Sequence, residues 1–135
     1  MRKIFVFGVL CFFSLFSRAD ESVIGHWQTT QVFDGLPVVV DIVITQLALK
    51  DKSTKMSFAS PRNCSVTFQY SGLVEEYEFF YVASTTLSTW CERNMRPGKR
   101  KVAYMKAKTN QSGQLIYDLF QNGARVEGGI AKRLK

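Results

Sequence analysis

Hydrophobic and polar residues alternate along short stretches of the chain, which is the pattern of β-strands that bury one face. The alternation is unbroken in residues 63–70, where Cys64, Val66, Phe68 and Tyr70 each follow a polar residue. Other stretches alternate less regularly or are continuous apolar runs. The strands predicted from all of them are residues 23–32, 38–49, 54–59, 63–70, 73–83, 86–91, 101–108, 114–120 and 124–133.

Turn-forming residues separate these strands. Glycine, proline, serine, asparagine or aspartate interrupts the pattern at residues 34–37, 60–61, 71–72, 96–98 and 122–123, which predicts turns there. Asn122-Gly123 predicts a tight hairpin, because both residue types tolerate positive φ. No stretch keeps a period of 3.6 residues, so we expect at most one short helix, around residues 88–94.

These elements predict an all-β fold. Short strands joined by hairpins must bury their apolar faces, either by closing one sheet on itself or by packing two sheets together. Consecutive hairpins without a central helix favour a small antiparallel up-and-down meander, closed into a barrel of about eight strands. The alternative is a two-sheet β-sandwich.

The first 19 residues have the three parts of a secretory signal peptide. Residues 1–3 carry two cations, residues 4–16 are apolar, and residues 17–19 begin and end with a small side chain. The apolar run of about 13 residues is shorter than the roughly 20 that a transmembrane helix needs. We therefore expect a periplasmic or secreted protein with one domain at residues 20–135 and no transmembrane anchor.

Signal cleavage would remove Cys11 and leave Cys64 and Cys91. Two cysteines in a small exported domain predict a disulfide bond. A redox-active pair would need a closer spacing that lowers the pKa of one thiol. A disulfide closing this loop would add about 3–4 kcal/mol to the stability.

Gly25-His26-Trp27 opens the first predicted strand and resembles the G-x-W signature of lipocalins and related calycin barrels. The resemblance implies that Trp27 closes one end of a barrel and packs against an arginine near the last strand. Arg133 stands where that arginine would be expected, and Arg125 is a second candidate. The second family signature is not apparent, so the resemblance covers only the two ends of the chain and the strand count.

Aromatic residues make up 13% of the chain, which supplies enough rings to line a cavity. Our first hypothesis is an exported binding protein that holds an apolar or amphipathic small molecule inside a lipocalin-like barrel. An ordinary filled core is the alternative, because small barrels fill with side chains. The cavity-lining candidates are Phe58, Phe68, Tyr70, Tyr77, Phe79, Tyr104 and Tyr117.

The net charge is +7, and most of the excess lies between residues 93 and 108. Residues 96–101 read as an exposed cationic loop, which would attract phosphates, acidic glycans or anionic lipid. The second hypothesis is therefore an envelope protein that binds or inhibits an anionic partner through this loop, although the loop could equally be plain solvated surface. An exported chain is not expected to bind nucleic acid. The anionic-partner candidates are Arg93, Arg96, Lys99, Arg100 and Lys101.

Residues that could do catalysis are few, and we expect a monomeric binding protein rather than an enzyme, without a metal or cofactor. His26 is the single histidine and, by alternation, points away from Trp27 toward solvent. Asp41 is expected on the outward face of its strand. The acidic residues around Glu76 are expected to be solvated or to face the basic segment.

Overall fold

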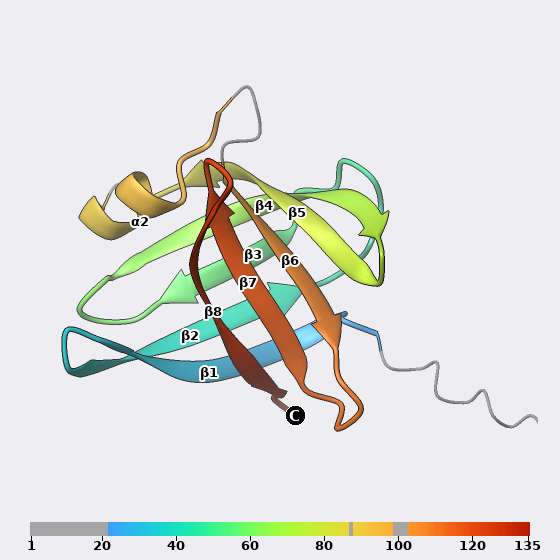
Figure 1. Cartoon of the computed structure of the whole chain (residues 1–135), viewed down its shortest axis with the longest axis horizontal. Coiled ribbons are helices and arrows are strands. Elements are labelled where there is room, and N and C mark those ends of the chain that lie inside the picture. The colour runs from blue at the N-terminus through green and yellow to red at the C-terminus, as the bar shows by residue number, and fades with distance from the viewer. Residues whose placement is uncertain (1–21, 87, 99–102) are drawn as a thin grey trace, which may run out of the picture.

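The computed structural model describes residues 22–86, 88–98 and 103–135. Their strands form one closed antiparallel barrel, and a single short helix lies at one end of it (Figure 1). The elements are β1 (Gly25–Phe33), β2 (Leu36–Ile44), β3 (Thr54–Phe58), β4 (Cys64–Val74), β5 (Tyr77–Thr85), α2 (Thr89–Asn94), β6 (Ala103–Thr109), β7 (Leu115–Gln121) and β8 (Ala124–Arg133).

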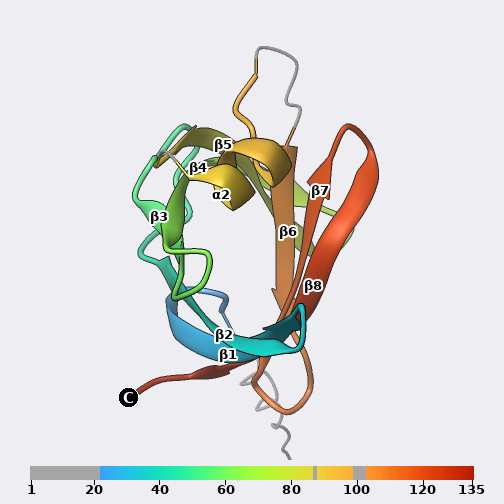
Figure 2. The ribbon, with the colours of Figure 1, turned by 90° about the vertical axis from the view of Figure 1, so that its left-hand side faces the viewer.

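Each strand pairs with the next strand in the sequence, and β8 returns to pair with β1. This is the predicted up-and-down barrel, so the fold class is confirmed and the sandwich alternative is wrong. Figure 2 looks toward the end of the barrel on which α2 lies. We call this the α2 end, and the other end, where β1 begins and β8 finishes, the Trp27 end.

The core fills the barrel interior, because alternate residues of each strand point inward. In β2, Val38, Val40, Ile42 and Ile44 are buried, whereas Val39 between them is exposed. The largest interior side chains, including Trp27, have exposed fractions between 0% and 1%. A side chain with no accessible surface touches no space large enough for a water molecule, either outside or inside the barrel.

Several predicted strands differ from the structure. The strand predicted at residues 86–91 is wrong, and the short helix expected around residues 88–94 is present as α2. The strand predicted at residues 38–49 ends at Ile44. Asp51 forms local hydrogen bonds in the connection that follows Ile44. Its carboxylate accepts from the Gln46 side chain and the Ser53 backbone N–H, at 2.6 and 3.0 Å. Such side-chain bonds compete with strand pairing.

The turns show where positive φ is needed. Asn122 and Gly123 form the predicted tight hairpin, with φ of 53° and 81°. The turn predicted at Ser71-Gly72 is wrong, because β4 continues to Val74 and its pairing only shifts register at Gly72. The chain turns instead at Glu75 and Glu76, which have φ of 49° and 80°. Glutamate rarely adopts this conformation, so the sequence carried no signal for it.

Cys64 and Cys91 form the predicted disulfide, which ties the start of β4 to α2. No helix in the described part of the chain is long and apolar enough to cross a membrane. The predicted signal peptide, residues 1–19, lies outside the described residues.

Candidate binding sites at the two ends of the barrel

The Trp27 end is closed by a stacked arginine. Trp27 is fully buried, and its ring N–H donates a hydrogen bond to the Val23 carbonyl oxygen at 2.8 Å. The guanidinium carbon of Arg133 lies 4.2 Å from the Trp27 ring centroid, and the two residues are partners in the β1–β8 register. The guanidinium also donates to the carbonyl oxygens of Ile24 and Ser22, at 2.7 and 3.0 Å.

Glycine is favoured beside this stack, where residue 25 has a φ of 152°. A Cβ atom on Gly25 would lie 2.4 Å from Arg133 Nη1, so a larger residue would push the guanidinium away from Trp27. Arg125, the second candidate for this contact, lies elsewhere. It forms an ion pair with Asp118 at 2.7 Å near the β7–β8 turn.

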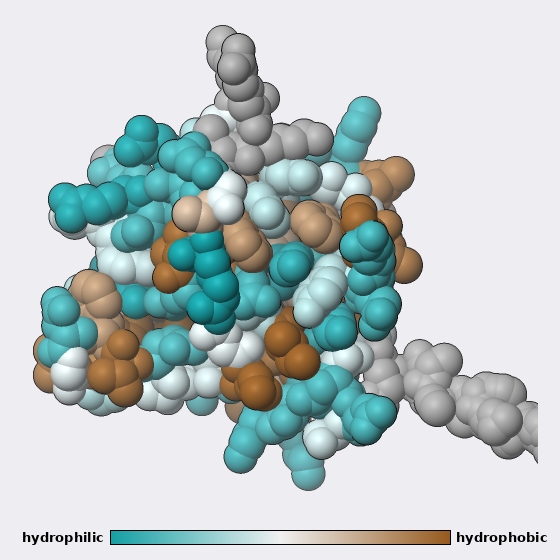
Figure 3. Space-filling model, viewed as in Figure 1, coloured by the Kyte–Doolittle hydropathy of each residue, from teal (hydrophilic) through white to brown (hydrophobic). Residues whose placement is uncertain are grey.

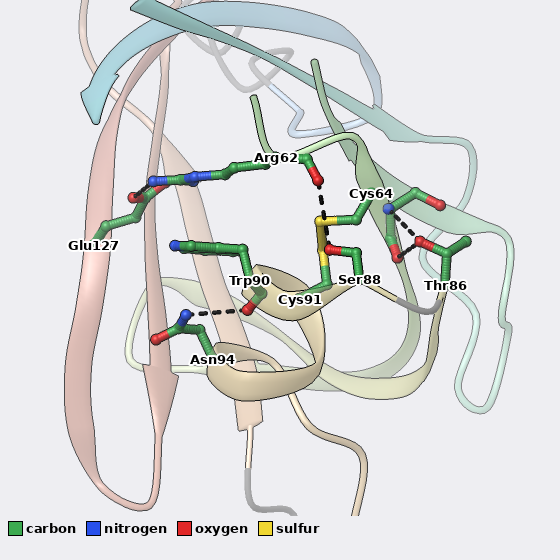
Figure 4. The surroundings of a disulfide bond; sticks show 9 residues. Arg62, Cys64, Thr86, Ser88, Trp90, Cys91, Asn94 and Glu127 are labelled. Carbon is green, nitrogen blue, oxygen red and sulfur yellow. Dashed lines mark hydrogen bonds and ion pairs between the residues drawn. A yellow bond between two sulfur atoms is a disulfide. The ribbon is translucent and has the colours of Figure 1, made fainter. Parts of the chain in front are cut away.

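The α2 end contains a buried ion pair that the sequence did not reveal. Arg62, in the β3–β4 connection, has an exposed fraction of 6%. Its two terminal nitrogens donate to the two carboxylate oxygens of Glu127 in β8, at 3.0 and 2.8 Å (Figure 4). The guanidinium lies 3.7 Å from the Trp90 ring centroid, with the rings of Phe33 and Phe58 at 4.7 and 5.1 Å. An arginine in a turn carries no periodic signal, so only the tertiary structure shows this pair.

The disulfide positions Trp90 in this cluster. Cys91 is bonded to Cys64, which follows Arg62 by two residues, and Trp90 is the neighbour of Cys91 in α2 (Figure 4). The Ser88 hydroxyl donates to the Arg62 carbonyl oxygen at 3.4 Å. The predicted disulfide therefore holds the helix so that its tryptophan covers the buried arginine.

An open pocket of about 280 Å³ lies at the α2 end, with Phe33, Arg62, Trp90, Arg93 and Asn94 in its lining. Arg93 is exposed and forms no ion pair within the described part of the chain. Glu127 neutralises Arg62, so Arg93 gives the pocket a net positive charge. This combination of an aromatic ring and an exposed cation suits a ligand with an anionic group on an apolar or planar body.

The predicted basic loop is only partly described. The Arg96 backbone N–H donates to the Gln121 side-chain oxygen at 2.8 Å, and the Gln121 amide donates to the Arg93 carbonyl oxygen at 2.7 Å. These bonds attach the segment after α2 to β7 while both arginine side chains face solvent. Lys99, Arg100 and Lys101 lie outside the described residues.

Four of the predicted cavity residues lie inside the barrel. Phe58, Phe68, Tyr70 and Tyr117 have exposed fractions between 0% and 7%. Burial raises the pKa of Tyr117 to about 12, although a hydrogen bond from Gln31 opposes the shift. Burial, with help from the Glu78 carboxylate, also raises the pKa of Tyr70 to about 12. These side chains pack with the core, and their role in holding a ligand stays a prediction.

The other three cavity candidates, Tyr77, Phe79 and Tyr104, point outward, contrary to the prediction. Alternation explains this, because their neighbours Phe80 and Met105 take the inward positions. The ring centroids of Phe79 and Tyr104 lie 5.5 Å apart, and those of Tyr104 and Phe120 lie 5.0 Å apart. The rings stack on one another across β5, β6 and β7, which stabilises the outer face of the sheet.

The polar residues considered for catalysis lie on the surface. His26 points outward, with 48% of its side chain exposed, and lies 3.2 Å from Asp41 on the next strand. Glu76 faces Lys108 at 3.5 Å, whereas Glu78 accepts a hydrogen bond from the Tyr70 hydroxyl. Within residues 22–86, 88–98 and 103–135, no three His, Cys, Asp or Glu side chains are grouped so that they could hold a metal ion.

Comparisons with protein-family models, with curated proteins and with solved structures give no match to this chain. The argument for function therefore depends on the geometry of the two ends.

Proposed function

We propose that this protein is an exported binding module whose α2 end receives an anionic group of a partner. The observation that carries the proposal is the pocket between Trp90 and Arg93, which joins an aromatic surface to an exposed cation. The partner would be an envelope or extracellular molecule that presents a carboxylate or phosphate next to an apolar group. This is the sequence-based interaction hypothesis, moved from residues 96–101 to the pocket at the α2 end.

Electrostatics favour an anion at this place. The net charge of +7 would become +4 after removal of Arg2, Lys3 and Arg18 with the signal peptide. A positive protein raises the local concentration of anionic partners. Because the pocket is partly enclosed, a charge-assisted hydrogen bond from Arg93 would be less screened by water than on a flat surface.

The fold and the disulfide agree with this function. A closed barrel with Arg133 stacked on Trp27 supports a lipocalin-like architecture. A disulfide between Cys64 and Cys91 is typical of an oxidising compartment, which supports export. An apolar ligand inside the barrel has less support, because it would have to displace core side chains that have no accessible surface.

Binding to heparin and to a synthetic oligoglutamate peptide would test the proposal. Arg93→Glu with Arg96→Glu should lower the salt concentration that elutes the protein from heparin. Lys52→Glu with Lys135→Glu makes the same charge change on exposed residues away from the α2 end and should have at most half that effect, because the interaction is local. Equal effects of the two pairs would show that only net charge matters and would contradict the site.

Two further measurements separate the pocket from simple charge attraction. Trp90→Leu leaves the charge unchanged and should still weaken binding of the oligoglutamate peptide, because the aromatic wall is lost. Native mass spectrometry of the protein from its own host tests the internal ligand. A small co-purifying mass that organic solvent removes would favour the carrier hypothesis over this proposal.

A further inference from the structure

The barrel closes between β1 and β8 over a short distance only. The register pairs Trp27 with Arg133 and Gln28 with Lys132. Beyond these pairs, β1 continues to Phe33, and β8 comes from as far back as Ala124. In Figures 1 and 2 the two strands meet near the C-terminus and diverge toward the α2 end. We call the part in which β1 and β8 do not pair with each other, residues 29–33 of β1 and 124–131 of β8, the β1–β8 seam.

The backbone of the seam presents unpaired hydrogen-bonding groups. The Leu134 N–H donates to the His26 carbonyl oxygen at 2.7 Å, so the peptide groups of His26 face β8. Peptide groups of alternate residues in a strand face the same side, so those of Thr30 and Val32 also face β8. Within the described residues no strand pairs with them on that side.

Side chains, rather than backbone pairing, bridge the seam. The Gln31 amide donates to the Gly128 carbonyl oxygen and the Tyr117 hydroxyl, at 3.2 and 3.1 Å. A Cβ atom on Gly129 would lie 2.2 Å from the Gln31 nitrogen, so glycine is needed to let this bridge form. Gln31 lies on the inner side of the seam, which leaves the outer side of its edges open.

Exposed aliphatic side chains flank the seam on the outer face. Val32 of β1 is 76% exposed, Leu36 at the start of β2 is 54% exposed, and Ile130 of β8 is 52% exposed. Figure 3 shows hydrophobic surface over the β1–β2 hairpin and over the region of β7 and β8. Aliphatic residues on both sides of an unpaired strand edge are a feature that proteins normally avoid, because the edge can pair with another chain.

We propose that the seam receives an extended segment of a partner protein, which pairs as a strand with β1 at Thr30 and Val32. An extended main chain is the occupant that these edges fit, because it offers donors and acceptors at the same alternating spacing. Its outward side chains at alternate positions would be apolar and would lie between Val32 and Ile130. The Gln31 bridge and the ion pair of Arg62 with Glu127 stay in place beneath the added strand.

The seam shares Phe33 with the α2-end pocket, but Thr30 and Val32 do not line that pocket, so this proposal and the pocket proposal can fail separately. Peptides would be selected from a random displayed dodecapeptide library against the folded, oxidised protein, and the tightest would serve as the probe. In the free protein, hydrogen exchange measured by NMR should be fast at the Thr30 and Val32 amides. The bound peptide should slow hydrogen exchange at both amides.

Thr30→Pro gives the decisive variant, because it removes an N–H that pairs with none of the described strands on that side, and proline is accepted at strand edges. The affinity of the selected peptide for this variant should fall by about fivefold or more, which is the effect of one lost hydrogen bond. Thr30→Val keeps the N–H and should bind normally. If Thr30→Pro does not fold, Val32→Lys serves instead, since lysine blocks edge pairing.

Four results would overturn the proposal. The Thr30 and Val32 amides could already be protected in the free protein, or the library could yield no binding peptide. A selected peptide could bind Thr30→Pro normally and lose affinity in Arg93→Glu, which would place it in the α2-end pocket. Sedimentation could show a dimer that Thr30→Pro dissociates, which would make a second copy of this chain the occupant.

Discussion

Both ends of the barrel have an arginine over a tryptophan, and the two pairs are built in opposite ways. At the Trp27 end the ring is fully buried, and the exposed Arg133 covers it while donating to backbone carbonyl oxygens. At the α2 end the arginine is the buried partner, and Trp90 remains partly exposed above it. Arg62 therefore needs a carboxylate, which Glu127 supplies with two hydrogen bonds.

A buried tryptophan and a buried arginine differ in how much they stabilise the fold. A buried indole stabilises the barrel by removing a large apolar surface from water. A buried guanidinium contributes little net stability, because its desolvation offsets the attraction to the carboxylate. The ion pair at the α2 end, however, fixes Trp90 and leaves part of its ring accessible beside Arg93. We therefore expect the Trp27 end to contribute mainly to stability, and we place the proposed binding function at the α2 end.

The largest predicted effect is at the Trp27 end. Trp27→Ala should lower the free energy of unfolding by about 3–5 kcal/mol, since truncating a fully buried aromatic side chain leaves a cavity. Trp90→Ala should cost clearly less, because Trp90 is partly exposed. Urea unfolding followed by circular dichroism would compare the two variants. Equal costs would remove the distinction between the ends.

The disulfide should matter next, and mainly at the α2 end. Replacing both Cys64 and Cys91 by alanine should cost about 3–4 kcal/mol, because the unfolded chain is no longer constrained. The fluorescence of Trp90, measured in a Trp27→Phe background, should then shift toward that of solvated indole. The fluorescence of Trp27, measured in a Trp90→Phe background, should not change. A shift of both would mean that the disulfide supports the whole barrel.

The buried ion pair should show strong coupling. Glu127→Gln leaves the Arg62 charge without its carboxylate and should cost about 3 kcal/mol. Arg62→Met should cost a similar amount, and the double variant should cost less than the sum of the two by at least about 1 kcal/mol. Additive costs in this cycle would show that the two side chains do not stabilise each other.

The alkaline stability should report the burial of Tyr117. Because the folded pKa is raised from 10.0 to about 12, the folded state keeps a proton that the unfolded state loses above pH 10. The contribution of Tyr117 to the free energy of unfolding is complete below pH 10. Above pH 10 the free energy of unfolding falls by up to about 1.4 kcal/mol per pH unit, and the fall ends near pH 12. Unfolding free energies at pH 9 and pH 11 should therefore differ by about 1 kcal/mol more in the wild type than in Tyr117→Phe. An identical difference would indicate that Tyr117 ionises freely in the folded state.

The barrel could be predicted from the sequence because strand alternation and turn residues are local signals. Trp27 and Arg133 could be paired only through the resemblance of residues 25–27 to a family signature, since more than a hundred residues separate them. The inner and outer faces of β5 could not be distinguished by hydrophobicity, because Phe79 and Phe80 are both aromatic.

The residues of the α2 end could not be predicted in the same way. Arg62 lies in a turn, and Glu127 faces inward only after an irregularity in the β7–β8 register between Leu119 and Phe120. Their meeting depends on the closed barrel. The β1–β8 seam is also invisible in the sequence, because residues 23–32 and 124–133 are each predicted as one strand and nothing in them marks the part that lacks a partner.

The smallest predicted change in the free energy of unfolding is that of replacing the exposed Arg133. Arg133→Ala removes a cation that stacks on Trp27 and two hydrogen bonds to carbonyl oxygens. Because Arg133 is exposed, water can replace these bonds, and the expected cost is about 0.5–1 kcal/mol. Arg133→Lys should recover only part of it, since an ammonium group cannot stack as a planar guanidinium does. If Arg133→Ala cost as much as Arg62→Met in the same urea series, the Trp27 end would also depend on its arginine, and stability could not be assigned to the buried indole alone.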